Sequence, residues 1–132
     1  MHPHPHQITV KRARAASACW TGERLEAFCG PAGLTPRELI DRMYAGAISP
    51  ADCLWALCCA TDAHRLHLEC ALEYAAGLQE ARGVPPTLGR DGLDHLHRGD
   101  RYACSATYAW LTRRLGAADR IDVCEYLASV LM

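Results

Sequence analysis

The chain has 132 residues, of which half are hydrophobic and 7% are aromatic. This length is enough for one domain that closes its core without disulfides or a structural metal. Fourteen lysines and arginines nearly balance 15 aspartates and glutamates, so the formal net charge is −1. A nucleic-acid-binding protein usually carries a basic face, and a mimic of a polyanion would carry a large acidic excess, so the composition favours neither class.

The lengths of the hydrophobic runs and the number of cysteines indicate the cellular compartment in which the protein is expected. No run approaches the roughly 20 apolar residues that a membrane-spanning helix needs, so we expect no membrane partner. The first six residues have no hydrophobic segment typical of a signal peptide, so we expect a cytoplasmic protein. The chain has eight cysteines, and in a reducing cytosol we expect them to remain free thiols.

Residues 1–18 differ from the rest and are predicted to form an extended N-terminal arm before a single helical domain over 19–132. Alternating histidine and proline disfavour helix at the start, because each proline drives the residue before it toward extended geometry. Residues 8–10 could continue as a short strand. The basic residues that follow indicate either a loosely ordered arm or an arm that contacts a partner through Lys11, Arg12 and Arg14.

Helix-starting signals recur from Thr21 onward. Thr35 and Glu38 form a capping box with a proline at the first helical position, and Ser49 with Asp52 repeats the device. The apolar residues that follow recur at helical spacing throughout. Helices are predicted over 23–29, 36–45, 49–60, 63–82, 88–97 and 101–115, and a last helix is predicted to follow Gly116 and run through Ile121 to Leu131. The fold predicted is all-α, a compact bundle of about six or seven short helices whose neighbours along the chain pack together.

The densest group of possible metal ligands lies in the middle of the chain. His64, His67 and Cys70 are spaced one helical turn apart, and zinc favours such side chains. Cys53 and Cys58, however, lie about 140° apart around their helix axis, so the two cannot bind one metal ion together without a break in the helix. The sequence also has no C-x-x-C pair. We therefore predict no cofactor and an interior role for Cys58, Cys70, Cys104 and Cys124, with a zinc protein centred on His64, His67 and Cys70 as the alternative.

The sequence contains no recognised catalytic motif and no helix suited to recognise DNA bases. A cysteine nucleophile needs a base and an orienting group, yet no cysteine stands in a known catalytic motif, and no glycine-rich phosphate loop occurs. Residues 36–60 have the spacing of a helix-turn-helix. Their second helix offers almost no basic or amide side chains for base edges, so a nucleic-acid partner is not expected. We predict that the protein is not an enzyme.

Three tryptophans, Trp20, Trp55 and Trp110, are candidates either for the core or for a binding surface. Tryptophan is strongly enriched in the energetic hot spots of protein interfaces. Trp55 is predicted to flank the core. Trp110 precedes two arginines, and this patch completes the predicted partner-binding set: Trp110, Arg113, Arg114, Lys11, Arg12 and Arg14.

Several stretches between Leu34 and Asp100, about half of the chain, share one further pattern. They are the Leu-Thr-Pro of 34–36, the Glu-Leu-Ile of 38–40, Ser49-Pro50, the Leu-Trp-Ala-Leu of 54–57, a long helix from Cys70-Ala71 through Glu80, Pro85-Pro86, and the Arg-Gly-Asp of 98–100. In these stretches the chain resembles bacterial helical domains classed as immunity proteins. The resemblance implies a helical protein that neutralises a partner protein by binding it and has no catalytic residues. A phage-type inhibitor of a host defence complex is a close rival of the same class.

Overall fold

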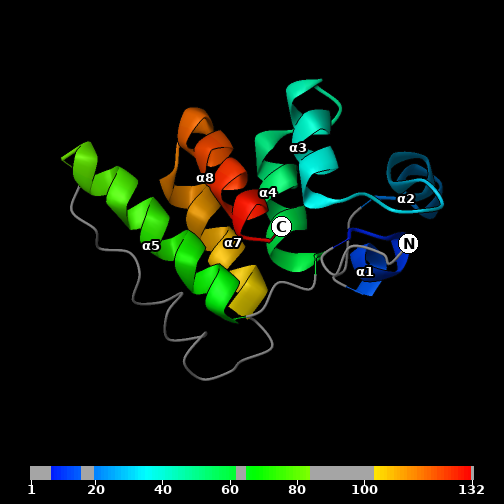
Figure 1. Cartoon of the computed structure of the whole chain (residues 1–132), viewed down its shortest axis with the longest axis horizontal. Helices are drawn as coiled ribbons and strands as arrows, with labels where there is room; N and C mark the ends of the chain where they lie inside the picture. The colour runs from blue at the N-terminus through cyan, green and yellow to red at the C-terminus, as the bar shows by residue number, and fades with distance from the viewer. Residues whose placement is uncertain (1–6, 16–19, 62–64, 84–102, 132) are drawn as a thin grey trace.

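The computed structural model describes residues 7–15, 20–61, 65–83 and 103–131. Within these ranges the chain forms seven α-helices and no strands, which confirms the all-α class (Figure 1). The predicted helix over 88–97 lies outside the described residues. The helices are α1 Val10–Ala15, α2 Gly22–Cys29, α3 Pro36–Tyr44, α4 Pro50–Cys59, α5 Arg65–Ala81, α7 Ala103–Arg114 and α8 Ala117–Val130.

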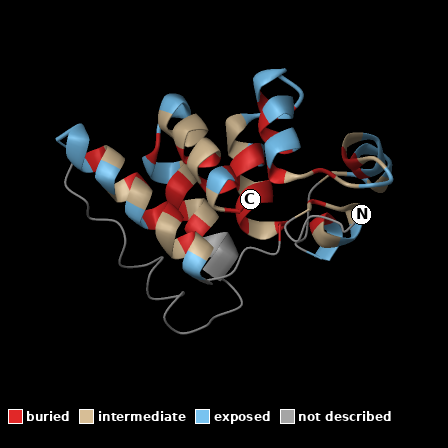
Figure 2. Ribbon diagram, in the orientation of Figure 1, coloured by how far each residue is buried: buried red, intermediate tan, exposed pale blue. Residues whose placement is uncertain are grey.

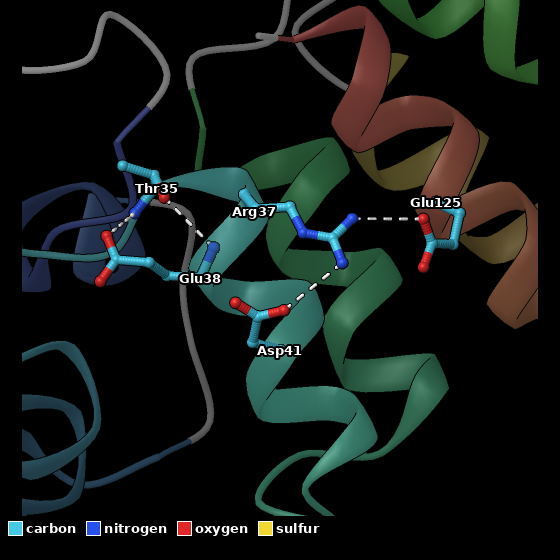
Figure 3. A network of polar contacts seen from close by, with 5 residues as sticks. All are labelled: Thr35, Arg37, Glu38, Asp41 and Glu125. Carbon is cyan, nitrogen blue, oxygen red and sulfur yellow. Dashed lines mark hydrogen bonds and ion pairs between the residues drawn. The ribbon is translucent and has the colours of Figure 1, made fainter.

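The helix starts are fixed by side chains that cap them. The hydroxyl of Thr35 accepts a hydrogen bond from the Glu38 backbone N–H at 3.2 Å, and the Glu38 carboxylate accepts one from the Thr35 N–H at 3.1 Å (Figure 3). Ser49 accepts from the Asp52 N–H at 3.1 Å in the same way. Each bond satisfies a backbone donor that the first turn would leave open, and its loss typically costs about 1 kcal/mol. The predicted starts of α3 and α4 are therefore confirmed.

Helix α4 lies at the centre of the bundle, where it packs against α3, α7 and α8. Its side chains Leu54, Leu57 and Cys58 are fully buried, as is Thr61 just after it. Helix α8 also packs against α3 and α5, and α5 packs against α7. Figure 2 shows the buried residues gathered on the inner faces of these helices.

Polar contacts hold α5 against α8 at the edge of this core. The Tyr74 ring stacks on Tyr126 with 4.1 Å between ring centroids, and the Tyr74 hydroxyl donates to the Asp122 carboxylate at 2.6 Å. Arg82 and Asp119 form an ion pair at 2.6 Å near the end of α5. Because the Asp119 side chain is mostly buried while Arg82 is exposed, water weakens this pair only in part.

The N-terminal arm is pinned to the domain and is only partly extended. Ile8 and Leu34 form an isolated antiparallel bridge, with N–H···O distances of 2.6 and 2.8 Å. Contrary to the extended geometry predicted for the whole arm, Val10–Ala15 is helical. The Thr9 hydroxyl caps it by accepting from the Arg12 N–H at 3.1 Å, and burial of Ala13 against neighbouring elements adds tertiary stabilisation. Helices α1 and α2 pack together beside the bundle (Figure 1).

Gly33 makes the bridge possible. Its φ is +77°, and a Cβ there would lie 2.7 Å from the Ile8 carbonyl oxygen. We expect Gly33→Ala to destabilise the protein by about 2 kcal/mol or more in urea unfolding, because it adds a clash with the bridge to the cost of a positive φ. Gly30→Ala is the matched control, since Gly30 has φ +70° with nothing within 4 Å. Equal losses in the two variants would show that the Ile8 contact contributes nothing.

Candidate binding site

An apolar pocket of about 260 Å³ lies where α1 and α2 meet α4 and α7. A dry apolar cavity of about 150 Å³ is large enough to bind benzene, so this pocket could hold a larger aromatic side chain. The residues that line it come from both sides of this junction: Ile8, Ala13, Trp20, Leu25, Phe28, Cys29, Ile48, Asp52, Trp55, Ala56 and Tyr108.

Aromatic rings form much of the pocket wall. Trp20 meets Phe28 edge to face, with ring centroids 5.2 Å apart. Trp55 from α4 and Tyr108 from α7 line the pocket from the bundle side. All four are partly buried and pack against the core, so the prediction that Trp55 flanks the core is confirmed. The pocket thus has walls that are fixed from behind by the core and faces that a partner could still cover.

One carboxylate and two guanidinium groups set the charge around the pocket. Asp52 lines it and, after burial, is the next largest cause of the raised pKa of the Tyr108 hydroxyl. The Arg24 guanidinium lies 3.8 Å from the centroid of the Trp20 ring, and Arg42 lies 5.7 Å from that of Phe28. Cation–π contacts of this kind contribute about 0.5–1 kcal/mol at exposed sites. They also hold the two arginines against rings that line the pocket, and Arg24 and Arg42 are called the rim arginines below.

The Trp110 patch predicted from the sequence does not form on the surface. Trp110 is only 4% exposed and belongs to the core. The reason is that α7 packs against both α4 and α5, which buries a face wide enough to include Trp110 and Leu111. Arg113 and Arg114 are exposed at the end of the helix, and the Arg113 Nε donates to the Ala109 carbonyl at 3.3 Å. A partner could contact these arginines without the tryptophan.

The three cations of the arm differ in their surroundings. Arg12 is half-buried, and its Nη1 donates to the Gln7 carbonyl at 2.8 Å, so it helps to hold the arm in place. Lys11 and Arg14 are exposed. The Arg14 guanidinium lies over Gly22 at the start of α2, where a Cβ would overlap it. Of the predicted contact residues in the arm, Lys11 and Arg14 are therefore the ones on the surface.

The predicted zinc ligands are only partly within the described ranges. His67 and Cys70 are half-buried on α5, whereas His64 lies outside those ranges. Among the residues that the structure describes, no three histidine, cysteine, aspartate or glutamate side chains are grouped so that they could hold a metal ion. The zinc site stays a prediction.

The interior role predicted for the cysteines is confirmed for Cys58 and Cys124, which are fully buried. Cys70 is half-buried, and the side chain of Cys104 lies outside the described residues. The Cys124 Sγ donates to the Pro50 carbonyl at 3.6 Å. The pKa of the Cys124 thiol is raised far above its usual 9.0. The larger cause is a hydrogen bond with Cys53, and the second is burial of the thiol.

Sequence reasoning did not identify this pocket. The chain's single phenylalanine, Phe28, and two of its three tryptophans meet there. The small number of large aromatic residues in the chain was the only signal in the sequence that could have indicated the pocket. The spacing of residues 20, 28, 55 and 108 does not indicate that they converge.

No protein-family model, curated protein or solved structure matches the chain. In the described part of the chain, no helix is both long and apolar enough to cross a membrane.

We expect Trp110→Ala to lower the free energy of unfolding by about 3–5 kcal/mol, because it leaves a cavity in a packed core. Arg113→Gln, on the exposed side of the same helix, should change it by no more than about 0.5 kcal/mol. Both values can be measured by urea unfolding followed by circular dichroism. A loss below about 1 kcal/mol for Trp110→Ala would contradict the burial of this side chain.

The raised pKa of Cys124 predicts a loss of stability at alkaline pH. Above pH 9 the unfolded chain releases this proton while the folded chain keeps it, so stability falls by up to about 1.4 kcal/mol per pH unit. Below that pH the thiol is protonated in both states and contributes no slope. Cys124→Ala should unfold with a shallower alkaline slope than the wild type in urea titrations at pH 8 to 10. Parallel slopes would show that Cys124 titrates normally in the folded protein.

Proposed function

We propose that this protein is a non-enzymatic protein-binding module of the immunity or inhibitor kind, working in the cytoplasm. The observation that carries the proposal is the aromatic-lined pocket at the junction of α1 and α2 with α4 and α7. Binding energy at protein interfaces is concentrated in a few well-packed pockets that take an aromatic or arginine anchor from the partner. A pocket of this size and lining suits that role.

The placement of the aromatic residues supports binding. Trp55 stands on α4, whose inner face is fixed in the centre of the core. Tyr108 stands on α7, beside the buried Leu111. Because these supports are rigid, a partner that covers the rings loses little side-chain freedom on the protein's side of the interface.

The chemistry of the pocket supports binding over catalysis. Besides the indole N–H groups of two tryptophans, its polar side chains are Asp52, Tyr108 and Cys29, and no described histidine lines it. Burial raises the pKa of the Cys29 thiol, although Arg42 lowers it in part. A thiol that keeps its proton is a poor nucleophile.

The cysteines support the cytoplasmic part of the proposal. The six described cysteines are all free thiols, as expected in a reducing compartment. An immunity protein and a phage-type inhibitor of a host defence complex would both act by covering a partner. The same experiment therefore applies to either.

Filling the pocket should weaken binding without unfolding the protein. Ala56 is buried and lines the pocket, so the ring of Ala56→Phe would occupy the space. Ala27 is exposed on α2 and does not line the pocket, which makes Ala27→Phe the matched control. We expect Ala56→Phe to weaken partner capture from host extract about tenfold or more, as for loss of one anchoring pocket.

Capture should be quantified for the wild type, both phenylalanine variants and Arg113→Glu, with circular dichroism to verify folding. A partner that binds Ala56→Phe normally but is lost from Arg113→Glu would move the contact to the end of α7. In that case the pocket would not be the binding site.

A further inference from the structure

We propose that the pocket takes an aromatic side chain flanked by acidic residues of a partner protein. This inference rests on the proposed function and adds the chemistry of the partner. It comes from the charges that surround the pocket and from the single carboxylate that lines it, the exposed Asp52.

The two arginines whose positions are fixed by aromatic rings make the surroundings of the pocket basic. Arg24 and Arg42 lie against the rings of Trp20 and Phe28, and both arginines are exposed. Among the residues that the structure describes, the ion pairs use Arg37 and Arg82 instead. The rim arginines can therefore pair with carboxylates from outside.

Helix α1 adds to this charge. It carries Lys11, Arg12 and Arg14 and no acidic residue, and its Ala13 lines the pocket. Glu23 and Glu26 on α2 offset part of this charge. Helices α1 and α2 together are thus net basic, although the whole chain has a formal net charge of −1. Complementary charge of this kind speeds association and selects partners more than it adds affinity.

The carboxylate that lines the pocket disfavours an anion beside it. Asp52 lines it near the Tyr108 hydroxyl, whose pKa it helps to raise. A partner carboxylate placed there would be repelled, so the acidic groups must stay at the rim beside Arg24 and Arg42. An indole N–H or a phenol O–H, by contrast, could donate to Asp52 while its ring covers the aromatic walls. The occupant is therefore apolar and aromatic, with one hydrogen-bond donor.

A second copy of the chain is the competing occupant. Tyr44 is 58% exposed, and the nearby Glu125 is the main cause of the raised pKa of its hydroxyl, so the protein itself presents an aromatic ring beside a carboxylate. Arg24 and Arg42 would attract any acidic segment. Self-association would therefore use the same contacts, an aromatic ring in the pocket and carboxylates beside the arginines. The test must distinguish the two.

Four fluorescein-labelled pentapeptides provide the probes. One has a central tryptophan with two glutamates on each side; in two others lysines or glutamines replace the glutamates. The last keeps the glutamates around a central alanine. In fluorescence anisotropy, we expect the glutamate–tryptophan peptide to bind about tenfold more tightly than each of the others, and to weaken as salt is raised.

Variants of the full chain assign this binding to its groups. Arg24→Gln and Arg42→Gln should each weaken the glutamate–tryptophan peptide several-fold and leave the glutamine peptide unchanged. Ala56→Phe should weaken both. Arg37→Gln is the control and should weaken neither, because this exposed arginine of α3 is already paired with Asp41 and Glu125.

Two peptide results would overturn the inference. Tighter binding of the lysine peptide would indicate a cationic occupant attracted by Asp52. Failure of the glutamate–tryptophan peptide to bind would rule out an acidic partner. If Ala56→Phe still loses a captured partner in either case, the proposed function stands without this inference. A dimer seen in sedimentation that Tyr44→Ser and Ala56→Phe both dissociate would instead identify a second copy as the occupant.

Discussion

The burial of α4 is the constraint on which the rest of this structure depends. A ten-residue helix in which Cys53, Leu54, Leu57 and Cys58 are all fully buried needs neighbours on several sides. Helices α3, α7 and α8 supply them. Each of these helices is short, and a short helix is marginal alone in water. Their stability therefore comes from packing against one another. A cavity at Trp110 would destabilise several helices at once.

The N-terminal segment is attached to this bundle by different means. One antiparallel bridge, between Ile8 and Leu34, ties it down, and the side chains of Ile8, Cys29 and Leu34 reach the main core. Helices α1 and α2 pack mainly against each other, beside the bundle rather than within it. A gap between two bodies joined in this way is lined by the apolar side chains of both. The pocket is a consequence of that arrangement.

Charge is distributed in the same two parts. The bundle uses its charged groups on its own helices, as in the pairs that Arg37 makes with Asp41 and Glu125 (Figure 3). Around the pocket, Arg24 and Arg42 lie on aromatic rings instead of on carboxylates. Surface ion pairs contribute little to stability, whereas exposed arginines held in place are well suited to a partner.

What the amino-acid sequence determined by itself is local. Caps such as Thr35 and Ser49 fix where helices begin, because they bond to backbone groups only three residues away, and apolar spacing indicates which face turns inward. The extended arm was predicted wrongly over Val10–Ala15, where burial of Ala13 favours helix. Only tertiary packing decided that Trp110 is buried while Trp55 borders a pocket, because both lie on amphipathic helices and differ in what packs against them. The candidate site joins residues far apart in the sequence, and no local pattern brings such residues together.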